Sequence, residues 1–195
     1  MISGYLTDWD ALCAEEIKGT VVIPVVTNRQ MRSINFTNVF HSITTNGYWL
    51  VNFDNIGKCR NNFLHVQKAE YSLKDKSNIR FLVEYVTTSD KTIGGLISLA
   101  SLTDFYSNRS GKLFQQYNAG PGDICLVDIF DITAINTNPQ TVKTIFFSRD
   151  NVAVRVRNLH GGDILAFAKL LDACILASPA PEPAQPPEKT GNKEK

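Results

Sequence analysis

The stretch that decides the fold is Thr88–Leu99, which has the sequence TSDKTIGGLISL. Its apolar residues recur at the spacing of one helical face, and Ser89 can cap the first turn. Gly94 and Gly95 interrupt this pattern, and each glycine costs a helix about 1 kcal/mol relative to alanine. Close approach of another backbone is the usual reason for such glycines. We therefore expect a helix that bridges two groups of strands, with an ordinary connecting helix as the plainer interpretation.

The composition is typical of a globular domain. The 195 residues suffice for one good-sized core or two small ones, and 43% of them are apolar and 20% charged. No run is apolar enough to span a bilayer. Because the net charge is only +1, binding of nucleic acid would need clustered lysine and arginine. The acidic first 18 residues contain no signal-peptide core, and we expect a mitochondrial presequence to be absent or already removed.

The first half of the chain predicts four or five antiparallel strands. The valine-rich stretch Thr20–Thr27 gives the first strand, in which Pro24 indicates an edge strand or a bulge. Alternating apolar residues give a second strand at Arg32–Phe40, and Asn46-Gly47 predicts a tight hairpin turn after it. Further strands are predicted at Tyr48–Asp54, Phe63–Leu73 and Ile79–Val86.

The second half repeats this order. A short strand is predicted at Thr103–Tyr106, followed by a glycine-rich loop that ends at Gly120-Pro121-Gly122. A wide apolar stripe predicts a helix at Asp163–Ile175, which Ser178-Pro179 ends. The proline- and charge-rich tail, residues 179–195, has too few apolar side chains to form a core and is expected to be disordered. Strands are predicted at Ile124–Ile132, Val142–Arg149 and Val152–Arg157, with turns at Asn136–Gln140 and Asp150-Asn151.

Alternation predicts which side chains share a face of the sheet. In Val152–Arg157 the three valines are expected to face the core, while Arg155 and Arg157 point outward. In the strand that begins at Tyr48, one face is expected to carry Trp49, Val51 and Phe53.

The predicted plan is strands, helix, strands, helix, with a Gly-Gly pair near the start of each helix. Two antiparallel sheets packed face to face, with the helices gathered at one side, satisfy this plan. The expected fold class is therefore α+β. We expect an N-terminal extension at residues 1–17, one domain at residues 18–178 and the tail at residues 179–195.

Three stretches of the chain resemble a known family. Ile93–Leu99, followed by Asp104-Phe105-Tyr106, resembles the helix and following strand of Whirly-type proteins. Asp163–Pro179 is similar to their C-terminal helix. Lys18-Gly19-Thr20 is similar to their lysine-glycine opening, although a threonine stands in place of the family's second lysine. Order and spacing agree over residues 18–178, while Lys58–Ile79 is longer than in plant members.

This resemblance implies a fold of two packed antiparallel sheets, each followed by a helix (β4-α-β4-α), and a tetramer assembled through helices. The family includes plant organelle single-stranded DNA-binding proteins and kinetoplastid mitochondrial proteins that bind guide RNA. The longer insertion and the less basic composition favour the kinetoplastid group. The resemblance then implies a mitochondrial matrix protein that holds guide RNA by its phosphates on a sheet face and promotes annealing in RNA editing. It would act as a homotetramer or with a related chain, without a cofactor.

Binding of a single strand needs cations for the phosphates and aromatic surfaces for the bases. Arg155 and Arg157 are the strongest candidates because they share one face of a strand, and Lys143 and Arg149 form a second pair by the same parity. A solvated surface charge is the plainer interpretation of each cation taken singly. The other candidates are Arg29, Arg32, Lys58, Arg60, Lys68, Lys74, Lys76 and Arg80 for phosphates, and Tyr48, His65 and Tyr71 for stacking.

An enzyme or a metal site is not expected. His41, His65 and His160 are scattered, and no nucleotide-binding or nucleophile motif is present. The pattern of the cysteines favours buried thiols in a reducing compartment. An organellar single-stranded DNA-binding protein in transcription or DNA maintenance and a non-catalytic β-sandwich scaffold subunit stay open as alternatives. The cysteines, which form no C-x-x-C pair, are Cys13, Cys59, Cys125 and Cys174.

Overall fold

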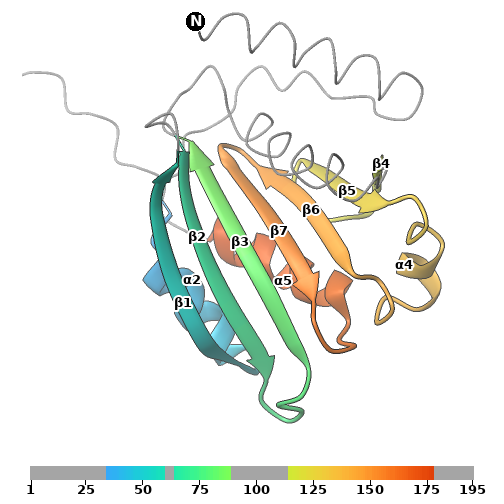
Figure 1. The fold of residues 1–195 in the computed structure, drawn as a ribbon, viewed down its shortest axis with the longest axis horizontal. Helices are drawn as coiled ribbons and strands as arrows, with labels where there is room; N and C mark the ends of the chain where they lie inside the picture. The colour runs from blue at the N-terminus through green and yellow to red at the C-terminus, as the bar shows by residue number, and fades with distance from the viewer. Residues whose placement is uncertain (1–33, 60–63, 89–113, 178–195) are drawn as a thin grey trace, which may run out of the picture.

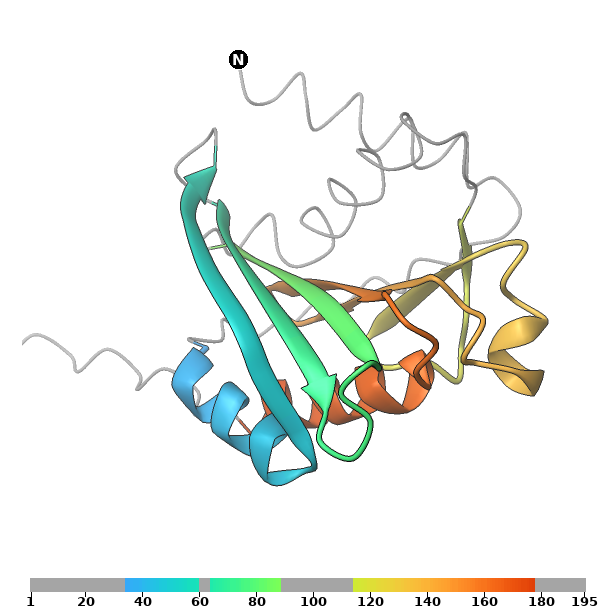
Figure 2. The ribbon, with the colours of Figure 1, turned by 60° about the horizontal axis from the view of Figure 1, so that its bottom comes forward.

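The computed structural model describes residues 34–59, 64–88 and 114–177. Their seven strands form one antiparallel sheet, in the order β1-β2-β3-β7-β6-β5-β4, and helices α2 and α5 lie on one of its faces (Figures 1 and 2). We call this face the helix face and the opposite one the second face. The strands are β1 Tyr48–Cys59, β2 Leu64–Leu73, β3 Arg80–Thr88, β4 Phe114–Gln116, β5 Ile124–Asp128, β6 Thr144–Arg149 and β7 Val152–Asn158. The helices are α2 Phe36–Thr45, α4 Ala134–Thr137 and α5 Ile164–Leu176.

The α+β class is confirmed, and the seven described strands belong to one sheet rather than to two packed sheets. The hairpins β2–β3 and β6–β7 and the helix α5 lie where the sequence predicts them, whereas β4 was not predicted. The strands predicted at Thr20–Thr27 and Thr103–Tyr106 and the helix predicted from Ser89 lie outside the described residues. So do the N-terminal extension and the tail.

The strand predicted at Arg32–Phe40 is wrong, because the chain forms helix α2 from Phe36 onward. Asn35 begins the helix: its side-chain oxygen accepts a hydrogen bond from the backbone N–H of Asn38 at 3.3 Å. The apolar side chains follow a helical spacing, which outweighs the short period-two pattern. The stripe that packs into the core consists of Phe36, Val39, Phe40 and Ile43.

Replacing Asn35 with alanine is expected to lower the free energy of unfolding by about 1 kcal/mol, because the first turn of α2 loses its side-chain acceptor. Urea unfolding measures the change. Asn38→Ala is the matched control: Asn38 is exposed, and only its backbone takes part in the cap. Equal losses in the two variants would contradict the assignment of Asn35 as the cap.

The alternation predicted for Tyr48–Asp54 is broken by a bulge. The register between β1 and β2 skips Val51, which has no partner residue on β2. Phe53 therefore faces the helices, where its ring centroid lies 4.8 Å from that of Phe40. Trp49, on the other side of the bulge, lies on the second face. The prediction that these side chains share one face is wrong.

Two turns also differ from their predictions. Asn46-Gly47 joins α2 to β1 instead of closing a hairpin, and Gly47 has a φ of +93°, which glycine adopts without strain. β5 ends at Asp128, although a strand to Ile132 was predicted. The side chain of Asp128 accepts a hydrogen bond from the backbone N–H of Phe130 at 3.1 Å, which starts a turn. The short helix α4 overlaps the first two residues of the turn predicted at Asn136–Gln140.

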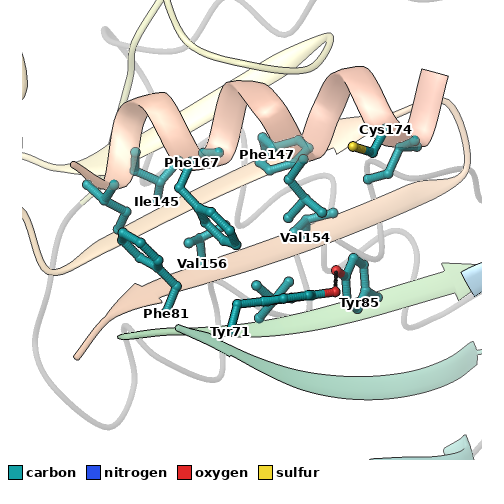
Figure 3. Packing of buried hydrophobic residues seen from close by; sticks show 14 of the residues in the cluster. Tyr71, Phe81, Tyr85, Ile145, Phe147, Val154, Val156, Phe167 and Cys174 are labelled. Carbon is teal, nitrogen blue, oxygen red and sulfur yellow. Dashed lines mark hydrogen bonds between the residues drawn. The ribbon is translucent and has the colours of Figure 1, made fainter. Parts of the chain in front are cut away.

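The core lies between the helix face and the two helices, and Figure 3 shows its packing against α5. Phe167 of α5 stacks on Phe81 of β3, with 4.3 Å between the ring centroids. The hydroxyl groups of Tyr71 and Tyr85 lie 2.9 Å apart, and burial raises the pKa of both. The predicted stripe of α5 is confirmed and is used inside the protomer. Its members, each 0% exposed, are Ile164, Phe167, Ala168, Leu171 and Ile175.

Candidate nucleic-acid interface

The second face, which carries both strongest arginine candidates, is buried at its centre. Apolar side chains from four neighbouring strands form a second cluster there, and each is at most 9% exposed. A phosphate backbone therefore has no access to the centre of this face. The members of the cluster are Val86, Ile124, Leu126, Phe146 and Ala153.

Arg155 lies within this buried region. Its strand parity is as predicted, but the residue is 1% exposed, so the prediction that it points into solvent is wrong. Its guanidinium forms an ion pair with Glu84, the residue directly opposite on β3. Burial lowers the pKa of Arg155 to about 10, while the charge of Glu84 acts against this shift. Arg155 thus stays cationic at neutral pH and is paired with a carboxylate.

Arg149 is also held by carboxylates, and its side chain is only 20% exposed. Its Nη2 and Nε donate to the carboxylate of Asp172 at 2.7 and 2.9 Å, and its Nη1 donates to Asp123 at 2.7 Å. These hydrogen bonds, first of all those to Asp172, raise the pKa of Arg149. Asp172 also accepts from the backbone N–H of Gly122 at 2.9 Å. This cluster ties α5 to the end of β6 and to the loop before β5.

The two predicted cationic pairs lie on opposite faces of the sheet. Ile145 and Phe147 of β6 belong to the core on the helix face. Lys143 and Arg149 have the same parity and therefore belong to that side, whereas Arg157 lies on the second face. The two pairs do not build one patch, which corrects the prediction from their spacing.

Two of the three stacking candidates belong to the core. Tyr48 is half-buried, and its ring centroid lies 5.0 Å from that of Phe167. Burial and the nearby charge of Asp163 raise the pKa of Tyr48. Tyr71 is fully buried beneath the helices. Neither ring is placed to stack on a base, and both predictions are corrected. The structure does not describe the side chains of the remaining candidates, which are Arg29, Arg32, Lys58, Arg60 and His65.

Lys68 belongs to a row of alternating charges on the second face. Asp54 of β1, Lys68 of β2, Glu84 of β3 and Arg155 of β7 are successive partners across four strands. Opposite charges directly across from one another stabilise a sheet. Because each cation in the row faces an acid, this row does not favour a phosphate.

Cations and an aromatic ring gather at one end of the second face, beside the β2–β3 turn. Trp49 is 57% exposed and lies opposite Ser72, which in turn lies opposite Arg80. Arg157 of β7 is exposed on the same face and is a diagonal neighbour of Arg80. We call this group the Trp49 patch; its members are Trp49, Lys74, Lys76, Arg80 and Arg157.

Lys74 fixes the position of the indole. Its Nζ lies 4.5 Å from the centroid of the Trp49 ring and donates a hydrogen bond to the carbonyl of Thr44 at 2.6 Å. Thr44 is in the last turn of α2, where a cation interacts favourably with the helix dipole. A cation over an exposed indole contributes about 0.5–1 kcal/mol. The ring is thereby held against the end of the sheet with much of its surface open.

The patch carries more positive than negative charge. Its four cations are accompanied by two acids, Glu70 and Asp75. Glu70 accepts a hydrogen bond from Arg80 at 3.2 Å, and both side chains are partly exposed. Lys76 lies in the exposed turn. All four cations were predicted from the sequence, Arg157 as the partner of Arg155 and the others singly. Trp49 was not predicted, because alternation without the bulge gives this residue the same face as Phe53.

A comparison with protein-family models, curated proteins and solved structures found no match for this chain. Across the described ranges no helix is long and apolar enough to cross a membrane. In the same ranges no group of three or more histidine, cysteine, aspartate or glutamate side chains could hold a metal ion. Cys125 and Cys174 are buried thiols, as predicted, and burial raises the pKa of both. Of the described surfaces, the Trp49 patch has the chemistry best suited to a ligand.

Proposed function

We propose that this protein binds single-stranded RNA through the Trp49 patch. The observation that carries the proposal is the exposed Trp49 indole with the Lys74 ammonium 4.5 Å from its centroid. Stacking of a base on an aromatic ring contributes about 1–3 kcal/mol and tolerates any sequence, because every base has a π-face. Lys76, Arg80 and Arg157 supply cations for the phosphates on either side of the stacked base.

The two kinds of contact have separate signatures. Phosphate contacts release counterions, so the logarithm of the binding constant falls with the logarithm of the salt concentration by roughly 0.7 per neutralised phosphate on a single strand. Three cations therefore predict a slope of roughly −2. Stacking on Trp49 adds affinity that depends little on salt. Arg80 must exchange its bond to Glu70 for one to a phosphate, so we expect it to contribute less than Arg157.

The resemblance to Whirly-type proteins supports RNA as the ligand. We propose that the RNA is a mitochondrial guide RNA, as in the kinetoplastid members of that family. A strand held at its phosphates and at single bases stays extended, with its charge screened and most base edges accessible. Pairing with a complementary message then becomes faster. The resemblance also implies a second packed sheet and a tetramer, and binding at the Trp49 patch requires neither.

Replacing Trp49 with alanine is expected to weaken the binding of a short oligouridine by about 5- to 150-fold, which corresponds to the loss of 1–3 kcal/mol of stacking. Fluorescence anisotropy measures the affinity, and thermal unfolding checks the fold. The matched control is Phe130→Ala, which removes an aromatic residue that is 83% exposed and lies in the loop after β5. Equal effects of the two substitutions would contradict the role of Trp49.

For the double variant Lys76→Ala, Arg157→Ala, the slope of the logarithm of the binding constant against the logarithm of the salt concentration is expected to become less negative by roughly 1.4, or 0.7 for each lost phosphate contact. Lys143→Ala, Lys169→Ala removes the same charge from exposed positions outside the patch and serves as the control. A larger change in the control pair would move the site to the helix side. If the wild-type protein binds no RNA at low salt, a scaffold role takes the place of this proposal.

A further inference from the structure

Strand β1 is an exposed edge of the sheet. It has 12 residues and, among the described strands, pairs with β2 alone (Figures 1 and 2). Three of its apolar side chains stay exposed: Trp49 at 57%, Val51 at 47% and Phe53 at 37%. A long edge strand with exposed apolar side chains is a template for pairing with a further strand.

The first half of this strand lacks the charges and the proline that commonly protect an edge strand against pairing. Native edge strands carry charges or proline at exposed positions. The segment Tyr48–Phe53 has the sequence YWLVNF and contains neither. The bulge at Val51 adds local twist but leaves this valine exposed. The large aromatic and aliphatic side chains of the segment favour pairing between strands.

A second copy of the same chain fits this edge. Across a two-fold axis, a segment meets its own sequence, so that any charge in it faces a like charge nearby. The uncharged segment Tyr48–Phe53 avoids this repulsion. Helix α5, by contrast, uses its apolar stripe inside its own core. We propose that two copies of this chain pair antiparallel through β1, so that two seven-stranded sheets join into one.

The contact is expected over Tyr48–Val51. The backbone N–H of Phe53 already donates to the side-chain oxygen of Asn52 at 2.9 Å, so the pairing ends before these residues. A two-fold axis perpendicular to the joined sheet keeps both helix faces on one side. So short a contact falls below the roughly 1,200 Å² of a stable interface, and the dimer is transient and dependent on concentration. The pairing does not require RNA.

Analytical ultracentrifugation from about 1 µM to about 1 mM, the range in which weak interfaces associate, tests the proposal. The wild-type protein is expected to shift from monomer to dimer across this range. Val51→Lys and Val51→Glu are each expected to raise the dissociation constant about two- to threefold, because Val51 faces Tyr48 of the other copy and the two like charges then lie roughly 11 Å apart across the axis. Val51 is exposed and has no partner on β2, so thermal unfolding should change little.

Mixing the two Val51 variants is the decisive step. Lysine on one copy and glutamate on the other then attract each other across the axis, and association is expected to return to at least the wild-type level. A heterologous contact, in which β1 meets a different surface, shows no such rescue. Phe130→Lys adds the same charge at an exposed loop position and should leave association unchanged. A wild-type protein that stays monomeric at about 1 mM, or variants that dimerise like the wild type, would overturn the proposal.

Discussion

Replacing Phe167 with alanine is expected to lower the free energy of unfolding by about 3–5 kcal/mol, close to the largest loss that a single core substitution causes. Phe167 is fully buried at the point where α5 meets the sheet. Its ring centroid lies 4.3 Å from that of Phe81 and 5.6 Å from that of Tyr71 (Figure 3), and 5.0 Å from that of Tyr48. Three rings on three strands cannot all move into the space left by a fourth, so the cavity stays largely open.

Urea unfolding measures this loss. Leu176→Ala provides a control in the last turn of the same helix, where the side chain is 45% exposed. Its expected cost is below about 1 kcal/mol, because it lies outside the buried stripe. A loss below about 1.5 kcal/mol for Phe167→Ala would mean that the aromatic cluster repacks around the site.

The parts of the fold that the sequence predicts correctly are those in which local and long-range signals agree. The helix α5 has both a wide apolar stripe and a cap: the side chain of Asp163 accepts from the backbone N–H of Ala166 at 2.9 Å. The hairpin β6–β7 has an apolar run in β6 and alternation in β7, joined by a turn in which Asp150 adopts a φ of +51°. Such turns suit aspartate, whose short side chain tolerates this conformation.

The errors come from features that one sequence does not show. In the stretch that forms α2, the apolar residues fit both a strand and a short helix, and packing against β1 decides between them. The bulge at Val51 shifts the alternation by one residue, which moves Trp49 to the second face. The four cations of the Trp49 patch come from a turn and two strands that are far apart in the sequence. Their grouping around an exposed ring depends on strand order, which alternation does not determine.

Burial of the charge on Arg155 is the clearest such case, and it predicts a large effect. Replacing Arg155 with alanine is expected to lower the free energy of unfolding by about 3–5 kcal/mol. The residue is 1% exposed, and its guanidinium pairs with Glu84, whose side chain is 20% exposed. Without Arg155 this largely dehydrated carboxylate loses its ion-pair partner and keeps only Lys68 of β2 across from it. Arg157→Ala is the exposed control, because Arg157 lies two residues further along β7 on the same face. This substitution should lower the free energy of unfolding by less than about 0.5 kcal/mol.

The double variant Arg155→Met, Glu84→Leu separates loss of the ion pair from loss of packing. Removing both charges leaves no partner unpaired, and apolar side chains of similar size suit the neighbouring cluster on the second face. We expect its free energy of unfolding to lie within about 1–2 kcal/mol of the wild-type value, well above that of Arg155→Ala. RNA affinity should then distinguish the two arginines. Arg157→Ala should weaken binding without unfolding the protein, while the double variant should bind as the wild type does. A stable Arg155→Ala variant with reduced RNA affinity would instead place Arg155 in the binding site.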